Sequence, residues 1–527
     1  MDRDYTIFQM LTLFGSVFLG FASIVLWHGF KKRNTALIVL LIAAGIIRFS
    51  ITTYDSYLNL WDERYHAVVA KNMMDEPFKP MLYQDPVLPY SMESWNNNHI
   101  WLHKPPLFLW QMSLSMKVFG VNEFGLRFPG ALMSLLTVVL IWSLGRRWLN
   151  KHIAFYAALL YTFSSYILDL VSGYHHSEQN DTVFIFYVTL SFWSWAKNMD
   201  RQKWHWLVLT GLFAGAAVMT KWLSGLVIFA VWGIVLLSDR EMRKKLRSYI
   251  DITAAFLVSV LVFLPWELYT RKVFPAEHTV EAMAKAQHFH QPIEGHSGNI
   301  FWHFNVLDTI YAQGMKFLII PALILLWRRV RDKRIRLGMI LLFSIIFVFY
   351  SIASTKMPAF TLPALAIVYI AMGTLIYELF LLFKIRYKRL RYAGKISAIV
   401  LLTASIFWFL NVDHIKKIHT CWNKEQCHWR SEHIKGADVF REINSKNYPK
   451  NTVFINLKTF DHAQMMFYTD FVAYDRLPSD HEMQLLQQTK RAIVAFDSHN
   501  LEEFHEAYPW VILYDEGYWN NVKLSDE

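Results

Sequence analysis

Long apolar runs alternate with short polar loops from the start of the chain to about residue 412, and this pattern predicts a membrane protein. Each run approaches the roughly 20 residues that a helix needs to cross a bilayer. We expect about twelve transmembrane helices, at residues 7–29, 35–53, 128–145, 153–170, 182–197, 205–219, 222–238, 252–268, 312–327, 337–353, 359–383 and 396–412. The sequence thus predicts a mainly α, polytopic membrane domain over residues 1–412.

The stretch after residue 412 has the composition of an ordinary soluble protein. Short β-like runs, "NTVFINL", "RAIVAFD" and "WVILYDE", alternate there with helical patterns such as "SDHEMQLLQQTKR". This predicts a small soluble α/β domain over residues 413–527, a lid or docking module with no catalytic pattern. Cys421 and Cys427 lie at its start, and their spacing favours a local disulfide over free thiols or a zinc pair.

The distribution of charge orients the predicted helices. The net charge is +11, but 54% of residues are hydrophobic and only 18% are charged. Lysine and arginine cluster in loops 31–33, 146–151, 197–203, 240–247, 328–336 and 384–395, each after an odd-numbered span. By the positive-inside rule these loops face the cytoplasm, so both termini and the long loops 54–127 and 269–311 face outward. The basic residues therefore indicate no nucleic-acid partner.

The first apolar run is expected to remain in the protein. It ends in Lys31, Lys32 and Arg33 without a small-residue cleavage site, unlike a secretory signal peptide. We interpret it as a retained transmembrane helix.

The outer loop 54–127 carries the first candidate chemistry. "WDERYHAVVAKNM" opens with the acidic pair Asp62 and Glu63, and "HKPP" follows with Lys104. Such a loop at a membrane surface is typical of a site that holds an anionic lipid headgroup beside a general base. The alternative for Asp62 is simple capping of the helix that begins near Glu63.

Lys104 stands within an apolar and aromatic run, "HIWLHKPPLFLW". A charge beside so much hydrocarbon is unfavourable unless an anion or a water-filled cavity meets it. Pro105 and Pro106 fix the backbone and restrict where the lysine can point. The alternative is a lysine that snorkels to the interface between Trp101 and Trp110.

Eight motifs, in order, resemble the bacterial GT-C glycosyltransferases that take sugars from polyprenyl phosphate. That group includes the lipid A aminoarabinose transferase and the protein O-mannosyltransferases. The motifs are "WDERYHAVVAKNM", "HKPPLFLW", "FGVNEFGLRFPGALMSLLTVVLIWSLGRR", "HHSEQNDTVFIFYVTLSFW", "GLFAGAAVMTKWLSG", "LPW", "IEGHSGNIFWHF" and "STKMPAFTLPAL". Each is weak alone, but eight in order are specific, and they cover nearly the whole membrane domain.

The resemblance implies a GT-C fold with external amphipathic helices and transfer with inversion at the anomeric carbon. It makes Asp62 the candidate base that takes the proton of the acceptor hydroxyl, and cations must then meet the charge that grows on the leaving phosphate. The expected catalytic residues are Asp62, Asp181 and Glu63. The expected lipid-phosphate ligands are Lys104, Arg64, Lys356 and Lys221. The expected substrate and loop residues are His103, His288, Glu294, His296 and Tyr65.

Asp181, Lys221 and Lys356 also have a structural alternative. Asp181 opens a predicted span, where an N-cap would also place a carboxylate. Lys221 in "MTKWLSG" and Lys356 in "STKMP" could instead complete helix ends, where a cation is favourable.

A divalent metal, zinc or magnesium, is a further possibility. His103, Glu294 and His296 offer suitable ligands, but they must converge from two loops, and hydrogen-bonding histidines are the alternative. The sequence also departs from the family: His103 replaces an acid before the "KPP" lysine, "QHFHQP" with His288 replaces an arginine before "EGH", and Phe360 replaces an aromatic hydroxyl.

The sequence thus indicates an integral glycosyltransferase of the bacterial inner membrane, with its active site and C-terminal domain in the periplasm. Its expected partners are a polyprenyl-phosphate (undecaprenyl-phosphate) sugar donor, the lipid bilayer, and an acceptor that is lipid A, another glycan or a protein. No cofactor is certain. The alternatives are a transporter or flippase of lipid-linked sugars, which predicts charges near mid-span, and a scaffold that binds lipid carriers without needing Asp62.

Overall fold

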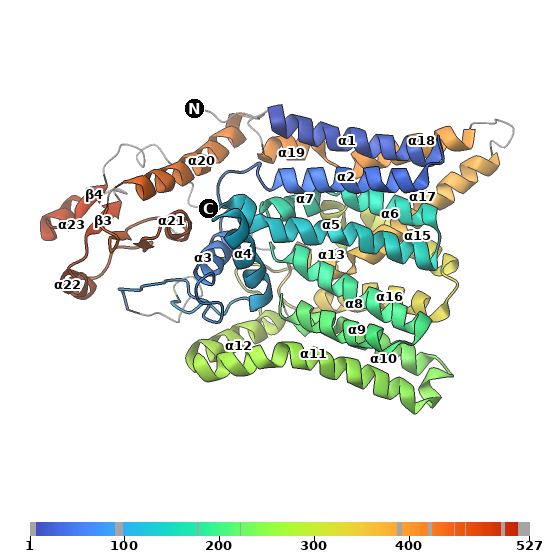
Figure 1. Cartoon of the computed structure of the whole chain (residues 1–527), viewed down its shortest axis with the longest axis horizontal. Helices are drawn as coiled ribbons and strands as arrows, with labels where there is room; N and C mark the ends of the chain where they lie inside the picture. Colours follow the sequence, from blue (N-terminus) through green and yellow to red (C-terminus); the bar gives the residue numbers. More distant parts are fainter. Residues whose placement is uncertain are drawn as a thin grey trace.

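Long helices lie side by side over most of the chain in the computed structural model (Figure 1). The structure describes residues 7–89, 98–175, 179–221, 223–386, 393–419, 424–446, 448–458, 460–496 and 501–514. The first helices are Ile7–His28 (α1), Arg33–Ile51 (α2), Asp62–Asn72 (α3), Pro106–Phe119 (α4), Glu123–Trp148 (α5), Lys151–Thr162 (α6), Ser165–Ser172 (α7), Asp181–Arg201 (α8), Trp204–Val218 (α9), Leu223–Leu226 (η2), Val227–Ser238 (α10), Met242–Lys244 (η3), Leu246–Val273 (α11) and Pro275–His290 (α12).

The second half of the chain continues the helical bundle and ends in a small sheet. Its elements are Trp302–Asn305 (α13), Leu307–Ile310 (α14), Met315–Arg329 (α15), Lys333–Ile352 (α16), Pro358–Ala364 (η4), Leu365–Arg386 (α17), Ala393–Phe409 (α18), Val412–His419 (α19), Lys424–Ser445 (α20), Val453–Ile455 (β1), Asp461–Tyr468 (α21), Val472–Ala473 (β2), Asp480–Gln488 (α22), Ile493–Phe496 (β3), Glu502–Ala507 (α23) and Ile512–Tyr514 (β4).

Seven helices of the described chain are long and apolar enough to cross a membrane. The number becomes up to eight if α6 and α7, which meet at a bend of 49°, form one broken span. Every predicted range coincides with a helix or a helix pair, but α9, α10 and α15 are shorter than the roughly 20 residues of a full span. The chain is therefore a multi-pass membrane protein, while the count of about twelve spans is not confirmed.

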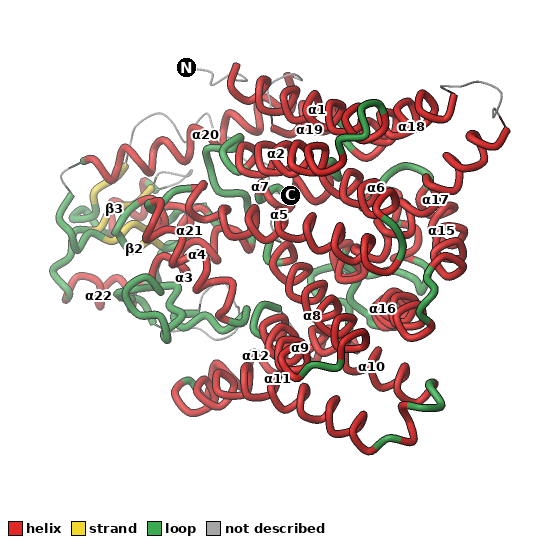
Figure 2. Tube along the Cα trace, turned by 45° about the vertical axis from the view of Figure 1, so that its right-hand side comes forward, coloured by secondary structure: helices red, strands yellow, loops and turns green. Residues whose placement is uncertain are grey.

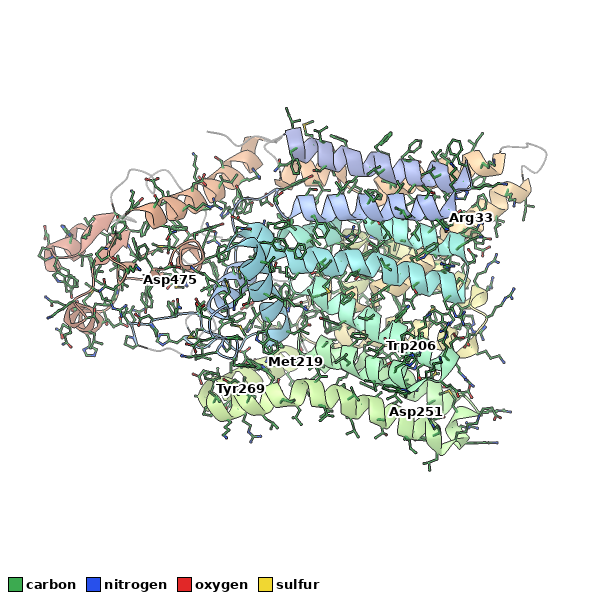
Figure 3. All side chains as sticks on the ribbon, viewed as in Figure 1. Arg33, Trp206, Met219, Asp251, Tyr269 and Asp475 are labelled. Carbon is green, nitrogen blue, oxygen red and sulfur yellow. The ribbon has the colours of Figure 1, made fainter. Side chains whose placement is uncertain are left out.

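The two long loops predicted to face outward lie at one end of the bundle. Figure 1 shows α3, α4 and α12 at the end where the C-terminal elements also lie. Figure 3 shows Arg33, in the predicted cytoplasmic loop 31–33, and Asp251, just after the predicted cytoplasmic loop 240–247, at the opposite end. Asp475 lies among the C-terminal elements. The structure thus gathers loops 54–127 and 269–311 on one face.

The C-terminal elements form a parallel sheet in the strand order β2-β1-β3-β4 (Figure 2). In its register Val453 pairs with Val472 on one side and Ile493 on the other, and Val494 pairs with Ile512. The central strands β1 and β3 are buried throughout, as in sheets covered on both faces. The domain boundary at residue 412 stays a prediction, and the expected Cys421–Cys427 disulfide lies outside the described residues and side chains.

Candidate active site

Asp62 and Lys104 form an ion pair at the end of the bundle that carries loops 54–127 and 269–311. Asp62 is the first residue of α3, and its Oδ2 lies 2.8 Å from Lys104 Nζ. The lysine precedes α4, where Pro105 is the N-cap and Pro106 the first helical residue, a position that suits proline. Both side chains are largely buried, with exposures of 7% and 14%. The two motifs that the sequence singled out therefore meet in space.

Lys104 keeps Asp62 ionised. Burial alone would raise the pKa of this carboxyl, but the charge of Lys104 and its hydrogen bond lower it to about 2, and the neighbouring His66 and His103 add to this effect whenever they are protonated. Burial lowers the pKa of His66 itself to about 4, so this imidazole is neutral at neutral pH. His66, which the sequence analysis did not select, lies with Nδ1 3.1 Å from Gln179 Oε1.

A second carboxylate–lysine pair lies beside the first. Asp181, the first residue of α8, has its Oδ2 2.6 Å from Lys221 Nζ, and both side chains are at most 6% exposed. The Lys221 ammonium also lies 5.3 Å from the centre of the Phe360 ring. This Phe360 is the residue that departs from the family's aromatic hydroxyl.

A backbone contact brings the two pairs together. The Leu107 N–H in the first turn of α4 donates to the Met219 carbonyl just after α9, at 3.0 Å. This contact joins the segment that carries Lys104 to the segment that carries Lys221. The charges of Lys104 and Asp62 also act on Asp181, which shows that the four groups form one electrostatic cluster.

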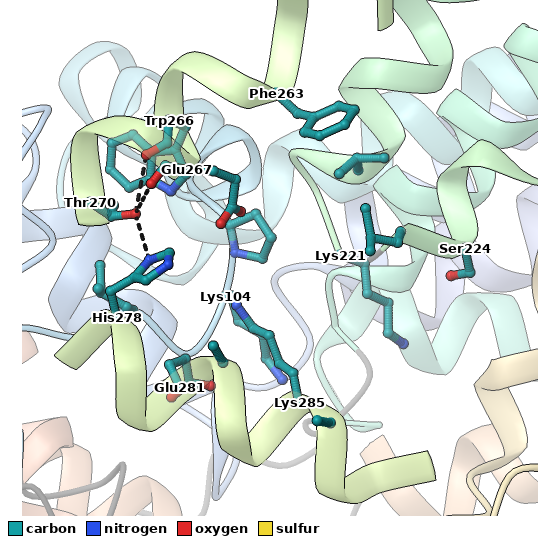
Figure 4. Close-up of a pocket in the computed structure, with 16 residues that line it drawn as sticks. Lys104, Lys221, Ser224, Phe263, Trp266, Glu267, Thr270, His278, Glu281 and Lys285 are labelled. Carbon is teal, nitrogen blue, oxygen red and sulfur yellow. Dashed lines mark hydrogen bonds between the residues drawn. The ribbon is translucent and has the colours of Figure 1, made fainter. Parts of the chain in front are cut away.

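A cavity of about 520 Å³ opens beside both lysines. Figure 4 shows Lys104, Lys221, Glu281 and Lys285 around it, the last two on α12. Its lining comprises Leu102, Lys104, Pro105, Val218, Lys221, Leu223, Ser224, Phe263, Trp266, Glu267, Thr270, His278, Glu281, Ala282, Lys285 and Ala286. The three lysines make it suitable for an anion.

An apolar groove of about 530 Å³ adjoins the cavity and shares Trp266 with it. Its lining is Phe78, Leu107, Trp110, Tyr187, Leu212, Phe213, Ala216, Met219, Val262, Pro265, Trp266 and Tyr269. A hydrocarbon chain fits such a surface. The cavity and the groove together offer one polar and one apolar compartment.

Lys285 is a cavity residue that sequence reasoning missed. It lies on the amphipathic helix α12, where a single lysine is expected on the solvated face and gives no local signal. Only the packing of α12 against the lysine-bearing loops turns it toward the cavity (Figure 4).

His103 contacts α12 rather than the other predicted metal ligands. Its Nδ1 lies 3.0 Å from Glu281 Oε1. Among the described residues, no group of three or more His, Cys, Asp or Glu side chains could hold a metal ion. The structure therefore does not bring His103, Glu294 and His296 together, and a bound zinc or magnesium stays a prediction.

Glu63 is enclosed by hydrogen-bond donors. Arg127 donates to both its oxygens, at 2.7 and 3.1 Å, and the backbone and side chain of Asn59 and the side chain of Gln179 add further bonds. These contacts are those of a structural anchor, so the catalytic role predicted for Glu63 finds no geometric support here.

Arg64 and Tyr65 point toward the C-terminal elements and do not line the cavity. Arg64 pairs with Asp461 of α21, and the Tyr65 hydroxyl lies 3.5 Å from His462 Nε2. The structure thus places both predicted ligands away from the lysine cluster.

Lys356 closes the end of α16. Its ammonium donates to the carbonyls of Tyr350, Ser351 and Ala353 at 2.5 to 2.9 Å, which satisfies the last carbonyls of the helix. The structural alternative for Lys356 therefore describes its contacts better than phosphate binding.

Glu294 and His296 lie apart from the lysine cluster. Glu294 is exposed, and the His296 carbonyl accepts the Lys356 N–H. His288 belongs to α12, but its side chain lies outside the described ones. Neither Glu294 nor His296 is among the residues that line the cavity.

Known proteins resemble this chain in sequence. Residues 103–269 match the family model "Dolichyl-phosphate-mannose-protein mannosyltransferase". An uncharacterized protein of Aquifex aeolicus is 30% identical over 313 residues, 58% of each chain. An undecaprenyl phosphate-alpha-4-amino-4-deoxy-L-arabinose arabinosyl transferase of Proteus mirabilis is 27% identical over 328 residues, 60% of this chain and 56% of its own. The chain thus spans just over half the length of these curated relatives.

The fold resembles a solved structure over nearly its whole length. The crystal structure of ArnT from Cupriavidus metallidurans bound to undecaprenyl phosphate aligns with a TM-score of 0.59 and 16% identity, covering 91% of this chain and 90% of that one. This likeness shows the fold alone. Together with the family model and the sequence relatives, it confirms the resemblance to the GT-C glycosyltransferases.

Proposed function

We propose that this chain is an integral membrane glycosyltransferase of the GT-C type. Its donor is a polyprenyl-phosphate sugar such as an undecaprenyl-phosphate glycose. The acceptor is a hydroxyl of lipid A, another envelope glycan or a protein, at the periplasmic face of the bacterial inner membrane. The observation that carries this proposal is the pair of Asp–Lys contacts, Asp62–Lys104 and Asp181–Lys221, beside one cavity with an adjoining apolar groove.

The compartments match the two parts of such a donor. The phosphate lies near Lys104, Lys221 and Lys285, and the first isoprene units lie in the apolar groove beyond Trp266. A phosphodiester carries one negative charge and the released monoester carries up to two. Cations therefore stabilise the leaving group more than the bound donor, as catalysis requires.

Asp62 takes the proton of the acceptor hydroxyl. The hydroxyl oxygen attacks the anomeric carbon, the bond from that carbon to the phosphate oxygen breaks, and its electron pair leaves with the polyprenyl phosphate. Because the attack is on the face opposite the phosphate, the configuration at the anomeric carbon inverts.

The donor itself activates the base. With Lys104 at 2.8 Å and a pKa of about 2, the Asp62 carboxylate of the free protein is a weak base. A phosphate that binds Lys104 competes with Asp62 for the ammonium and offsets its charge. The pKa of Asp62 then rises, so proton transfer becomes more favourable once the donor is present.

The transporter or flippase alternative has less support. A transporter is expected to carry charged residues near the middle of its membrane spans. The two carboxylate–lysine pairs lie instead at helix ends, because Asp62 and Asp181 are the first residues of α3 and α8. The curated relative from Proteus mirabilis is a transferase by name.

A reconstituted transfer assay tests the proposal. The full chain in lipid nanodiscs is incubated with a radiolabelled undecaprenyl-phosphate sugar and with lipid A, a glycan or a peptide acceptor. Release of undecaprenyl phosphate with a gain of one sugar mass on an acceptor is the expected result, and Asp62→Asn is the negative control. In sealed proteoliposomes, movement of intact donor from one leaflet to the other without release would instead establish the alternative.

A further inference from the structure

The first three residues of α3 point in three directions. Successive residues of a helix are rotated by about 100°. Asp62 contacts Lys104 at the cavity, Glu63 contacts Arg127 of α5, and Arg64 contacts Asp461 of α21. The helix that presents the proposed base is therefore held from the membrane side by Glu63 and from the C-terminal side by Arg64.

The contacts of Arg64 are fully buried. Its side chain has no exposed surface, and its Nη1 lies 2.5 Å from Asp461 Oδ1. The same guanidinium has Nε 3.3 Å from the Leu58 carbonyl and Nη2 3.5 Å from His433 Nδ1. One side chain thus connects the segment before α3 with two C-terminal helices, α20 and α21.

Asp461 depends on Arg64 for its hydrogen bonding. Its side chain is 6% exposed, and its second oxygen, Oδ2, has no hydrogen-bond partner among the described residues. A buried carboxylate without its cation is strongly unfavourable, so loss of either partner forces the other to move toward water. Such a movement shifts α21 relative to α3.

We propose that the Arg64–Asp461 ion pair positions the Asp62 carboxylate, so that the C-terminal region sets the rate of transfer although none of its described residues lines the cavity. This inference rests on the proposed function of Asp62 as the base. Arg64 and Asp461 are positioning residues, because they act through α3 and touch neither the lysines nor the cavity.

A second ion pair between the same elements provides a matched control. Lys71, near the end of α3, lies 3.0 Å from Asp470, which follows α21 and whose side chain is 91% exposed. An exposed pair contributes little to stability. It also lies two turns or more from Asp62, so Asp470→Asn should leave the carboxylate in place.

The test compares Asp461→Asn with Asp470→Asn in the full chain in nanodiscs. We expect Asp461→Asn to lower kcat roughly 10- to 100-fold with KM for the donor unchanged, since displacements of about 1 Å have effects of this size. In the control, kcat remains within about twofold of the unmodified protein. Equal kcat in the two variants, or a change confined to KM, would overturn the proposal.

A readout that needs no transfer separates this inference from the proposed function. If α3 shifts, the Lys104–Asp62 contact loosens and Lys104 becomes more reactive toward amine-directed reagents. Mass spectrometry should detect faster labelling of Lys104 in Asp461→Asn than in Asp470→Asn; equal labelling contradicts positioning. If the unmodified chain shows no transfer but Lys104 is labelled faster in Asp461→Asn, the proposed function is wrong while the positioning of α3 by Asp461 still holds.

If Asp461→Asn does not fold, Arg64→Lys tests whether the ion pair positions Asp62. The lysine keeps the positive charge but loses the fork that reaches Leu58, Asp461 and His433 together. A folded Arg64→Lys protein with lowered kcat and faster Lys104 labelling supports positioning. Unchanged kcat and labelling in this variant would refute it.

Discussion

His103 Nδ1 lies 3.0 Å from Glu281 Oε1, and this contact fastens α12 to the segment that carries Lys104. Glu281 lines the cavity, and His103 directly precedes Lys104, which also lines it. Burial would raise the pKa of Glu281, but the hydrogen bond and charge of His103, with Lys285 and Lys104, lower it below its usual value. The carboxylate is thus ionised at neutral pH and holds one wall of the cavity.

Glu281→Gln should weaken donor binding. The amide carries no charge to attract His103 or Lys285, so α12 is held less firmly and KM for the donor is expected to rise about tenfold, a loss of about 1.4 kcal/mol, with kcat little changed. Steady-state kinetics measure this. Glu277→Gln on the same helix, outside the cavity lining, is the control; an equal KM change in both variants would contradict the role of Glu281.

The pH dependence of transfer should differ between kcat/KM and kcat. The kcat/KM profile reports the free protein, in which the pKa of Asp62 is about 2, so no acid limb from this group is expected between pH 4 and 7. The kcat profile reports the donor complex, in which a phosphate occupies Lys104, so its acid limb is expected at higher pH. Coincident profiles would refute activation of Asp62 by the donor.

Stability should also respond to Asp62 at low pH. The folded pKa of about 2 lies below the ordinary 3.8, so ionised Asp62 stabilises the fold above pH 4. This contribution is lost as the pH falls from about 4 toward 2. Thermal unfolding in detergent across this range should show a smaller pH dependence for Asp62→Asn than for the unmodified chain.

Lys221→Met should destabilise the protein strongly. It leaves the fully buried Asp181 carboxylate without its cation, which is expected to lower the free energy of unfolding by roughly 3–5 kcal/mol. Thermal unfolding of Asp181→Asn, of Lys221→Met and of the variant with both substitutions forms a double-mutant cycle. The double variant should lose less than Lys221→Met alone, and strictly additive losses would argue against the pair.

Gly173→Ala should displace Glu63. Gly173 has a φ of +86°, and an added Cβ would lie 2.1 Å from Glu63 Oε1. The backbone strain alone is about 1–3 kcal/mol, and the shift of Glu63 disturbs α3, so both stability and transfer should fall. Gly233→Ala is the control, because nothing lies within 4 Å of its Cβ position and the residue is within α10; it should be neutral or slightly stabilising.

Lys285→Met should reduce affinity for the donor phosphate without unfolding the chain. The lysine lines the cavity yet is exposed, so its loss removes an attraction and leaves no buried charge. We expect KM for the donor to rise by roughly 3- to 30-fold, which corresponds to about 1–2 kcal/mol. Lys272→Met, at the end of α11 outside the lining, should leave KM unchanged.

The sequence by itself determined the helices and the residues of the central ion pair. Each range predicted from apolar run length coincides with a helix or a helix pair, because burial of apolar surface in lipid is a local requirement on each segment. The unusual position of Lys104 beside prolines identified it before any contact was known. Run length did not determine which of the shorter helices cross the membrane, since α9 and α10 are apolar but have fewer residues than a full span.

Only the tertiary structure decided what each polar side chain does. Asp62, Glu63 and Arg64 are consecutive and equally polar, yet about 100° of rotation per residue sends them to the cavity, to Arg127 and to Asp461. Lys356 binds the last carbonyls of α16, the helix that precedes it, and Lys285 lines the cavity because of the way α12 packs. Charge and spacing mark residues that need a partner, but the partner is fixed by which elements pack together.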